Sequence, residues 1–458
     1  MKLILLSGGS GRRLWPISNA SRSKQFVKVL KRDDGTLESM VQRVWRQLEE
    51  AELTNSSYIT TNQEQIGILQ NQLGNQIPTL IEPQQMDTFP AITLACLYLH
   101  AQEKVHPDEV ICVLPVDLYM EPEFINKMKE MDTILTTSHA DLAMIGVTPK
   151  FPSDHYGYII PKQDTSETAV NQKYIHVSHF VEKPDKETAE NLVQKQALWN
   201  CGVFAFRLGN FLSMLKQKNY SLDYHHLYEQ YGQLPKRSFD YEVVEELTNS
   251  VVIPYHGSWK DLGDWSTLIE ELPSNIIGNG IISNDSTNTF VINELNTPVV
   301  IQNLSNILAA VSPDGIMVTN LSDRKNTKEL LQKVRQRPMY EEKQWGWYRV
   351  YEHFPLQDER TILTKRLKIF KNRNISYQKH QNRNEIWVII SGEGRFALNQ
   401  KMSKVKAGDV LQIPTGAWHG IRADSDLELI EIQMGTELSE TDIVRMFSDW
   451  EDVEEICN

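Results

Sequence analysis

Residues 3–16, LILLSGGSGRRLWP, decide the fold of the first part of this 458-residue chain. The run at 3–7 has the length of a strand, is apolar almost throughout and leads into glycines. This pattern is typical of a central parallel strand that carries a loop at its carboxyl end. Strand-like runs at 57–61 and 111–114 alternate with helical periodicity at 39–53 and 63–73. We therefore expect an α/β fold with a doubly wound, mostly parallel sheet, which binds ligands beyond the carboxyl ends of its strands.

The character of the sequence changes near residue 273. Residues 276–320 hold short Ile and Val runs broken by Asn, Asp, Gly and Pro, which predicts a compact β-rich module or a few coils of a β-helix. A polar helix is expected at 323–337, and Pro338 marks a boundary. From residue 345 short strands alternate with glycine turns, as in a small β-barrel. The predicted domains are 1–273, a β-rich linker with its helix at 274–338, and a β-barrel at 339–458.

The composition and the charge pattern limit the expected partners and the cellular compartment. The formal net charge of -13 argues against nucleic acid, because proteins that neutralise duplex phosphates present a basic face. Every charged residue among the first 32 is basic, which indicates a local anion site, whereas the acidic stretch 437–455 is interpreted as a solvated face. The four cysteines have no paired spacing, so reduced thiols in the cytoplasm are expected. Neither a signal peptide nor an apolar stretch of about 20 residues is present, so no membrane span is predicted.

The glycine loop at 7–11 is the first candidate binding element. Because they lack Cβ atoms, Gly8, Gly9 and Gly11 let the backbone approach an anion, so that several N–H groups point at it. Arg13 adds a charge-assisted fork, and Lys24 adds a second cation. The spacing differs from the dinucleotide fingerprint and from the Walker A loop. A tight strand-to-helix turn with merely solvated cations is the alternative, but the combination of strand, loop and cations favours phosphate binding.

These residues also carry a family resemblance. Residues 6–26, LSGGSGRRLWPISNASRSKQF, resemble the LSGGxGxRLWPxS and PKQF signature of mannose-1-phosphate guanylyltransferases, within the sugar-phosphate nucleotidyltransferases. Ser23 replaces the family's proline, and the resemblance extends through most of residues 1–320. It implies catalytic roles for Arg13 and Lys24. It also implies a nucleotide site formed by Leu6, Gly8, Gly9, Gly11, Arg13, Lys24 and Glu82.

Two distant carboxylates match the family's metal-binding aspartates. Asp117 in VLPVDLY and Asp261 in WKDLGDW resemble the motifs VLPxDH and WxDxGxW. Nucleotidyl transfer develops negative charge on a phosphate, and Mg²⁺ is usually held by one or two carboxylates plus substrate phosphates. Carboxylates about 4 Å apart repel by about 4 kcal/mol at an effective dielectric of about 20, so such a pair needs a cation. A helix cap or turn is the alternative for each, and Asp264 is a rival ligand to Asp261.

Three further segments resemble the family's sugar-phosphate side. Residues 156–158, 181–184 and 199–204 resemble GYGYI, FxEKP and WNxGxF. They imply a sugar-phosphate site of Gly157, Glu182, Lys183 and Asn200. An EKP alone is commonly a surface turn, but the order of these segments favours binding. Met86 and Asp87 replace the family's Arg-Asn in EPxxRNTAPAI, and Leu118 replaces its histidine after the first aspartate, which leaves the base and the activity open.

Residues 345–435 resemble a cupin, like the mannose-6-phosphate isomerase domain fused to many of these transferases. The second cupin motif is matched by Gly408, Pro414, Gly416 and His419. In the first motif His380 and Glu385 are kept, while Asn382 stands where a second histidine is expected. His380, Glu385 and His419 form a candidate site for Zn²⁺ or another divalent ion with an open position. The barrel is then either an active isomerase or a metal-poor structural or regulatory module.

The resemblance implies a cytoplasmic transferase that makes GDP-mannose and pyrophosphate from mannose 1-phosphate and GTP with Mg²⁺. Its expected partners are a nucleoside triphosphate, a sugar 1-phosphate and a second copy of the chain in a homodimer, without nucleic acid or membrane. One alternative is a bifunctional enzyme whose cupin also interconverts mannose 6-phosphate and fructose 6-phosphate. The other is a non-catalytic paralogue that senses sugar nucleotides, which the departures at 86, 87, 118 and 382 favour.

Overall fold

A computed structural model describes residues 1–9, 12–162, 173–321, 327–334, 336–356, 359–439 and 442–457. The chain divides into two compact units. The first comprises residues 1–10, 24–65 and 76–273, and the second comprises residues 11–23, 66–75 and 274–458. Two short pieces of the N-terminal half thus group with the C-terminal half, which the sequence did not indicate. The division into three domains stays a prediction.

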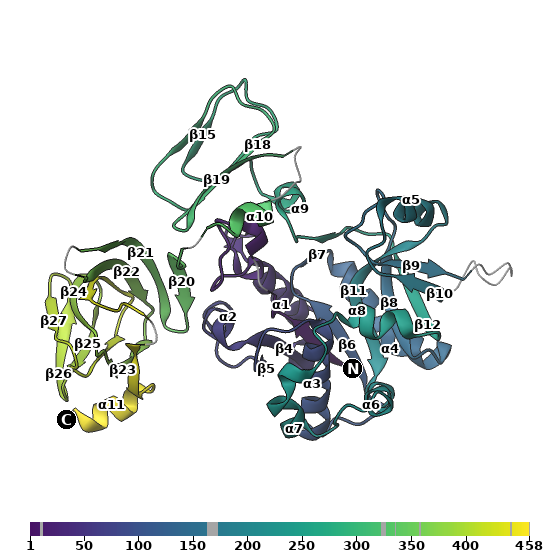
Figure 1. The fold of residues 1–458 in the computed structure, drawn as a ribbon, viewed down its shortest axis with the longest axis horizontal. Coiled ribbons are helices and arrows are strands. Elements are labelled where there is room, and N and C mark those ends of the chain that lie inside the picture. Colours follow the sequence, from purple (N-terminus) through teal and green to yellow (C-terminus); the bar gives the residue numbers. More distant parts are fainter. Residues whose placement is uncertain are drawn as a thin grey trace. The chain divides into compact units, whose positions relative to one another are not determined.

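The first unit is built on a nine-stranded sheet (Figure 1). In spatial order its strands are β5 (Thr79–Glu82), β4 (Ser57–Asn62), β1 (Lys2–Leu6), β6 (Val110–Pro115), β11 (Leu198–Arg207), β8 (Leu142–Val147), β12 (Ser250–Tyr255), β10 (Ile175–Val181) and β9 (Tyr158–Pro161). Strands β10 and β11 run against the shared direction of the others. The mostly parallel sheet predicted from the sequence is therefore confirmed. Leu3, Ile4 and Leu5 of β1 are fully buried, as expected of a central strand covered on both faces.

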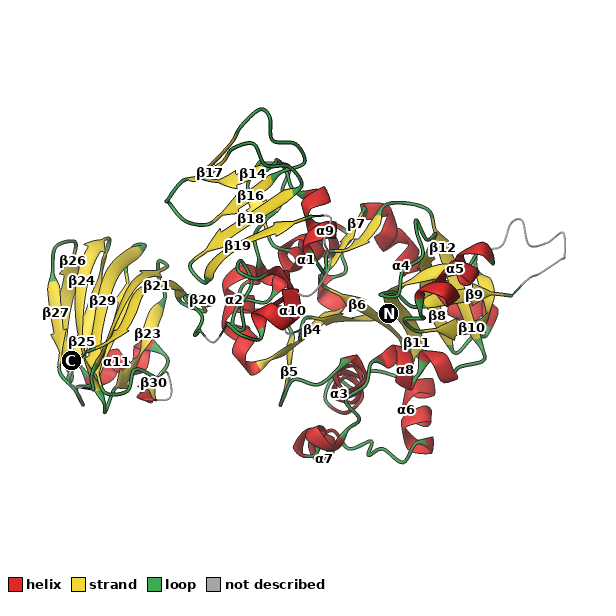
Figure 2. Cartoon of the chain, turned by 45° about the horizontal axis from the view of Figure 1, so that its top comes forward, coloured by secondary structure: helices red, strands yellow, loops and turns green. Residues whose placement is uncertain are grey.

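Helices cover both faces of this sheet. They are α1 (Met40–Glu50), α3 (Thr88–Ala101), α4 (Pro122–Ser138), α5 (Lys186–Gln194), α6 (Leu208–Gln217), α7 (Tyr224–Glu229), α8 (Phe239–Glu242) and α9 (Trp265–Leu268). Figure 2 shows α3, α6 and α7 on one side of the sheet and α1 and α4 on the other. Helix α1 begins with a capping box between Ser39 and Gln42, which satisfies the backbone N–H groups of these two residues.

The carboxyl ends of the parallel strands meet at one edge of the sheet, as predicted. Strand β1 ends at Leu6, beside Thr60 of β4 and Pro115 of β6. Beyond β6 the chain forms β7 (Leu118–Met120), which pairs with β13 (Trp259–Asp261). In this pairing Leu118 lies opposite Asp261, so Asp261 reaches the residue that follows Asp117. A short two-stranded ribbon thus joins segments that are far apart in the sequence.

In the second unit, residues 276–320 form a β-helix-like module. Its strands are β14 (Ile276–Gly278), β15 (Gly280–Ile282), β16 (Phe290–Asn293), β17 (Val299–Ile301), β18 (Ile307–Ser312) and β19 (Gly315–Asn320). The pairs β14–β16, β16–β18 and β15–β17 are parallel, which is the arrangement of stacked coils. Helix α10 (Thr327–Leu331) lies inside the polar helix predicted at 323–337, part of which falls outside the described residues. Helix α2 (Ile66–Leu73) also belongs to this unit.

Residues 12–23, which we call the strap, are held by this module through buried polar contacts. The Asn19 amide donates to the Asp314 carboxylate at 2.9 Å. Arg22 forms an ion pair with Glu294 at 2.8 Å. Both Asn19 and Arg22 are 5 % exposed, so their polar groups depend on these partners for satisfaction. The strap is therefore fixed by residues almost 300 positions further along the chain.

The C-terminal part of the second unit is the predicted β-barrel. One sheet contains β20 (Tyr340–Lys343), β21 (Gly346–Pro355), β22 (Thr361–Ile369), β29 (Leu427–Gly435), β24 (Arg383–Ser391) and β27 (Val410–Ile413). The other contains β26 (Lys401–Lys406), β25 (Glu393–Leu398), β28 (His419–Ala423), β23 (Asn374–Lys379) and β30 (Val444–Phe447), and α11 (Trp450–Ile456) follows. A core around Trp387, Phe396 and Leu429 fills the barrel.

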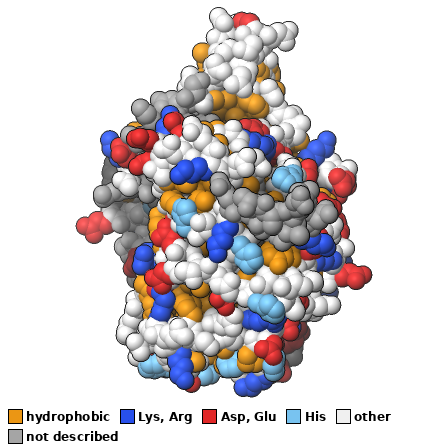
Figure 3. All heavy atoms as spheres, turned by 90° about the vertical axis from the view of Figure 1, so that its right-hand side faces the viewer, with side chains coloured by type: hydrophobic (Ala, Val, Ile, Leu, Met, Phe, Trp, Pro, Cys, Tyr) orange, Lys and Arg blue, Asp and Glu red, His pale blue; other side chains and the backbone are white. Residues whose placement is uncertain are grey.

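On the face drawn in Figure 3, acidic and basic side chains are interspersed. Within the described ranges, every helix is too short or too polar to cross a membrane.

Candidate active site

The glycine loop leaves the sheet directly after β1. Ser7 continues the hydrogen-bonded pairing of β1 with β4, since its N–H donates to the Thr60 carbonyl at 3.0 Å. Gly8 then passes the carboxylate of Glu82, which stands at the end of β5. A Cβ at Gly8 would lie 2.5 Å from a Glu82 oxygen, so a larger residue there would displace that carboxylate. The structure thus places Gly8 and Glu82, both predicted to contact the nucleotide, against each other.

Three glutamines that the sequence analysis did not single out hold the loop. The side-chain amides of Gln25, Gln85 and Gln65 donate to the carbonyls of residues 7, 8 and 9, respectively. Gln25 stands inside the KQF signature, which was the signal that could have pointed to it. Of the other predicted nucleotide residues, Gly11 lies outside the described residues, and Arg13 is exposed on the short helix η1 (Arg12–Leu14).

Lys24 and the two predicted metal-binding aspartates come together. The Lys24 ammonium lies 2.6 Å from an Asp117 oxygen and 3.6 Å from an Asp261 oxygen. The Lys24 side chain is 12 % exposed, but those of Asp117 and Asp261 are 27 % and 34 % exposed, so water screens these ion pairs in part. The backbone supports this geometry, because the N–H of Leu262 donates to the Asp117 carbonyl at 3.3 Å. Two carboxylates and a cation from three distant segments thus share one place at the carboxyl edge.

This set of donors fits magnesium. Carboxylate oxygens are the ligands that Mg²⁺ prefers, and two carboxylates that converge on one ammonium can converge on a divalent ion. Gly263 leaves room for the Asp261 carboxylate, because a Cβ at position 263 would lie 2.9 Å from an Asp261 oxygen. Asp264 accepts a hydrogen bond from the Thr267 N–H at 3.0 Å and caps α9. The geometry therefore favours Asp261 over its rival Asp264.

Glu82 is a buried carboxylate that accepts one side-chain hydrogen bond from the described part of the chain. Its side chain accepts a hydrogen bond from the Tyr231 hydroxyl at 2.8 Å. Burial raises the pKa of Glu82 to about 7, although the Tyr231 hydrogen bond opposes the shift. No sequence pattern pointed to Tyr231, which comes from the short helix η6 (Tyr231–Gln233) about 150 residues away.

The raised pKa of Glu82 predicts a specific pH dependence of stability. Between the ordinary pKa of 4.5 and about 7 the folded chain keeps a proton that the unfolded chain releases, so the free energy of unfolding falls as pH rises through this window. The variant Glu82→Gln lacks this titration, and the introduced amide oxygen can still accept from Tyr231. We expect wild type and variant to be equally stable near pH 5 and the variant to be more stable by about 2–3 kcal/mol near pH 8. Urea unfolding at the two pH values measures this; a constant difference would contradict the assignment.

The four residues predicted to bind the sugar phosphate also cluster. The Asn200 N–H donates to the Gly157 carbonyl at 2.8 Å, and its side-chain amide donates to Asp240 at 2.7 Å. Lys183 forms an ion pair with Glu182. Burial raises the pKa of Glu182, and it raises the pKa of Asp240 to about 7 together with the charge of Glu182. The Glu182 Oε2 atom is buried without a hydrogen-bond partner among the described residues, so it offers an acceptor to a hydroxyl ligand.

The three departures from the family pattern in this unit have structural explanations. Met86 packs against the hydrophobic core of the first unit. Asp87 is the N-cap of α3, and its carboxylate accepts a hydrogen bond from the Thr88 N–H at 2.7 Å. Leu118 is buried in β7 opposite Asp261. Each of these three residues therefore has a structural role, and their presence does not by itself imply that the chain has lost its activity.

The three predicted cupin ligands meet inside the barrel. Nε2 of His380 lies 3.2 Å from Glu385 Oε1, and Nε2 of His419 lies 3.6 Å from Glu385 Oε2. Nδ1 of His380 faces the Asp442 carbonyl and Nδ1 of His419 faces the Ala417 carbonyl, which directs both Nε2 lone pairs toward Glu385. Burial lowers the pKa of both histidines to about 4, so both are neutral at neutral pH. Such a set fits Zn²⁺ or a similar divalent ion.

Arg383 occupies part of the same space. Its Nε donates to Glu385 Oε1 at 3.1 Å, and its Nη2 lies 3.3 Å from His380 Nε2. A guanidinium at this place supplies the positive charge that a metal ion would otherwise supply. Either a bound metal ion or Arg383 can therefore balance the charge of Glu385. This geometry is compatible with an active isomerase and with a metal-poor structural or regulatory module.

Asn382 does not act in place of the missing histidine. Its amide donates to the Asp442 carboxylate at 3.2 Å, and its backbone N–H donates to the same carboxylate at 3.1 Å. Asp442 is 8 % exposed. The prediction that residues 437–455 form a solvated face is therefore wrong at Asp442, because the turn at 381–382 buries this carboxylate under its amides.

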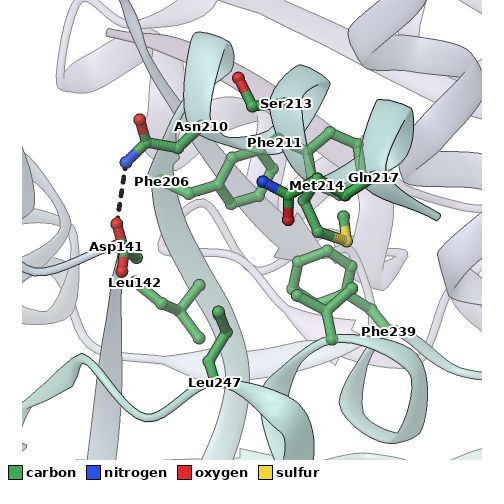
Figure 4. A pocket seen from close by; sticks show the side chains of 11 residues that line it. Asp141, Leu142, Phe206, Asn210, Phe211, Ser213, Met214, Gln217, Phe239 and Leu247 are labelled. Atoms are coloured by element: carbon green, nitrogen blue, oxygen red, sulfur yellow. Dashed lines mark hydrogen bonds between the residues drawn. The ribbon is translucent and has the colours of Figure 1, made fainter.

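A cavity of about 300 Å³ lies elsewhere in the first unit (Figure 4). It is lined by Asp141, Leu142, Phe206, Asn210, Phe211, Ser213, Met214, Gln217, Phe239, Val243 and Leu247. Leu142 begins β8 and Phe206 stands near the end of the antiparallel strand β11, so this is the amino edge of the sheet. None of the residues predicted to bind substrate lines it. The substrate site is expected at the opposite edge.

Two family models match this chain. Residues 2–275 match the model described as nucleotidyl transferase, and residues 332–448 match the model described as mannose-6-phosphate isomerase C-terminal. The first match covers more than half of the chain and contains every residue of the clusters around Lys24 and Asn200. The second contains the three candidate cupin ligands.

Curated relatives align over almost the whole chain. A mannose-1-phosphate guanylyltransferase of Salmonella muenchen is 28 % identical over 97 % of this chain and 97 % of its own length. A mannose-1-phosphate guanylyltransferase of Escherichia coli K12 is 26 % identical over 96 % of this chain and 97 % of its own. A Thermus thermophilus structure titled mannose-1-phosphate geranyltransferase has a TM-score of 0.59 and 23 % identity, and covers 72 % of this chain and 98 % of that one. That structure supports the fold alone.

Proposed function

The chain belongs to the nucleotidyl transferase family, and from that premise we propose that it joins mannose 1-phosphate to the guanylyl group of GTP, giving GDP-mannose and pyrophosphate. The observation that carries the proposal is the meeting of Lys24, Asp117 and Asp261 at the carboxyl edge of the sheet. The names of the aligned relatives support the choice of mannose 1-phosphate and GTP.

The proposed mechanism needs no covalent intermediate. A phosphate oxygen of the sugar 1-phosphate attacks the α-phosphorus in line, the bond to the β-phosphate oxygen breaks, and pyrophosphate leaves. Mg²⁺, held by Asp117 and Asp261, would supply charge stabilisation to the phosphates when bound. Lys24 and Arg13 neutralise charge that develops during transfer, and the glycine loop positions the triphosphate.

The sugar-side cluster is proposed to orient the nucleophile. Glu182 accepts hydrogen bonds from sugar hydroxyls through Oε2, which has no hydrogen-bond partner in the described part of the chain. Lys183 holds the sugar phosphate, and Asn200, itself oriented by Asp240, contacts a hydroxyl. Positioning of this kind raises the rate by holding the attacking oxygen near the phosphorus.

A substrate panel tests the proposal. Several nucleoside triphosphates are combined with several sugar 1-phosphates in the presence of Mg²⁺, and pyrophosphate release is followed. We expect the highest rate with GTP and mannose 1-phosphate. Tight binding of GDP-mannose without turnover of any pair would instead support the non-catalytic sensor. Light scattering of the same sample tests the expected homodimer.

A second activity is proposed for the cupin, because His380, Glu385 and His419 converge there. In this bifunctional alternative a divalent ion such as Zn²⁺ would polarise the sugar carbonyl during interconversion of mannose 6-phosphate and fructose 6-phosphate. His380 and His419 would supply neutral imidazole ligands to that ion.

The variant His380→Ala separates the two activities. We expect it to abolish both stoichiometric metal in the purified full chain and any isomerase activity, because it removes one of three ligands. The rate of nucleotidyl transfer should stay within about twofold, since the loss is confined to the barrel interior. Metal analysis and the two enzyme assays measure this. A metal-free wild type without isomerase activity would leave Arg383 to balance the charge of Glu385 and would exclude the second activity.

A further inference from the structure

The carbonyls of three successive loop residues are all held by glutamine amides. The contacts are Gln25 to the Ser7 carbonyl at 2.7 Å, Gln85 to the Gly8 carbonyl at 2.9 Å, and Gln65 to the Gly9 carbonyl at 3.2 Å. These glutamines come from three separate places, namely η2 (Lys24–Phe26), the loop between β5 and α3, and η4 (Gln63–Gln65). The loop backbone is therefore fixed at three successive carbonyls.

Because a peptide group is planar, holding its carbonyl also fixes the direction in which the N–H of the same peptide points. The C=O and N–H of a trans peptide point in opposite directions. The Gly8 carbonyl shares its peptide with the Gly9 N–H, so a glutamine on the carbonyl turns that N–H to the other side of the loop. Gly9 itself is exposed, and a Cβ built on it would meet nothing within 4 Å among the described residues, so the loop is open to a ligand at this residue. Amides that point into open space from a glycine loop are the donors that a phosphate accepts.

We infer that Gln85 is a positioning residue for the phosphates of the nucleotide, acting through the Gly9 amide. The inference rests on the proposed nucleotidyl transfer. Gln85 immediately precedes Met86 and Asp87, where the chain lacks the arginine of the family pattern. Gln25 and Gln65 are buried at 3 % and 1 %, whereas Gln85 is exposed, so Gln85 can be replaced without opening the core.

The test uses the full chain with Gln85→Ala and, as a matched control, Gln84→Ala. Gln84 is the adjacent exposed glutamine, and its amide lies against Gly232 and not against the loop. We expect Gln85→Ala to raise KM for the nucleoside triphosphate about threefold to tenfold, the effect of losing one hydrogen bond. The kcat and the KM for the sugar 1-phosphate should change less than about twofold, because the lost contact positions only the nucleotide.

Inorganic pyrophosphate with Mg²⁺ is a second probe, measured by calorimetry, because it has phosphates but neither base nor sugar. Its Kd should rise in Gln85→Ala by the same factor as the triphosphate KM. An unchanged Kd and KM in Gln85→Ala, or an equal change in Gln84→Ala, would overturn the inference. If wild type binds pyrophosphate and Gln85→Ala weakens it, but no substrate pair turns over, the inference holds while the proposed function fails.

Discussion

Replacing Asp261 with asparagine is expected to lower kcat for nucleotidyl transfer by about a thousandfold while the chain stays folded. The carboxylate lies in a short two-stranded ribbon and not in the core, with 34 % of its side chain accessible, so its loss costs little packing. The asparagine side chain is nearly isosteric but carries no charge to bind a divalent ion. The remaining Asp117 would still be paired with Lys24 at 2.6 Å. Steady-state rates at increasing Mg²⁺ measure the effect, and the variant should need far more Mg²⁺ for any residual rate.

The neighbouring carboxylate Asp264 provides a matched control. Asp264→Asn removes the same charge three residues away, and asparagine caps a helix about as well as aspartate. We therefore expect Asp264→Asn to keep its rate within about threefold and α9 to stay intact. Equal losses of rate in the two variants would show that the rate depends on the negative charge near the site and not on a metal ligand at Asp261. A fast Asp261→Asn variant with ordinary Mg²⁺ dependence would remove the metal role of this residue.

The sheet was predictable because its signals are local. The apolar run that leads into the glycines gave β1, and the alternation of strand runs with helical periodicity gave the class of fold. The insertion of β11 between two parallel groups was not predictable, since the sequence of β11 reads as an ordinary buried strand. The grouping of residues 12–23 with the C-terminal half depends on contacts such as Asn19 with Asp314, which no local pattern encodes.

The candidate site likewise has a part that could be predicted from the sequence and a part that could not. Lys24, Asp117 and Asp261 could be named from motif resemblance, and the ribbon of β7 and β13 brings the aspartates together. Tyr231 and Gln85 escaped notice because each contributes through one hydrogen bond to a distant segment. Composition was misleading at Asp442, because an acidic stretch is usually solvated, but an individual carboxylate in it can cap a turn.

Replacing Glu294 with glutamine is expected to loosen the strap. Burial alone would lower the pKa of Arg22, but the Glu294 carboxylate, together with smaller contributions from Tyr340 and Glu342, raises it, so Arg22 stays charged in the folded chain. Arg22 also stacks 4.7 Å from the ring centre of Tyr340. Without Glu294 its buried charge loses its counter-ion, and removing one partner of a buried pair costs about 3–5 kcal/mol. Because 28 % of the Glu294 side chain is exposed, we expect about 2–3 kcal/mol.

Hydrogen exchange of the strap amides measures this loss locally. A local destabilisation of about 2–3 kcal/mol speeds exchange at residues 12–23 by roughly 30- to 150-fold if these amides exchange by opening of the strap. The control is Glu428→Gln in the barrel, which breaks the more exposed ion pair with Arg366 and should cost less than about 1 kcal/mol. Unchanged exchange in Glu294→Gln would mean that Tyr340 and water suffice to hold Arg22. Faster exchange confined to the strap would show that a contact with the linker module keeps the segment between the glycine loop and Lys24 in place.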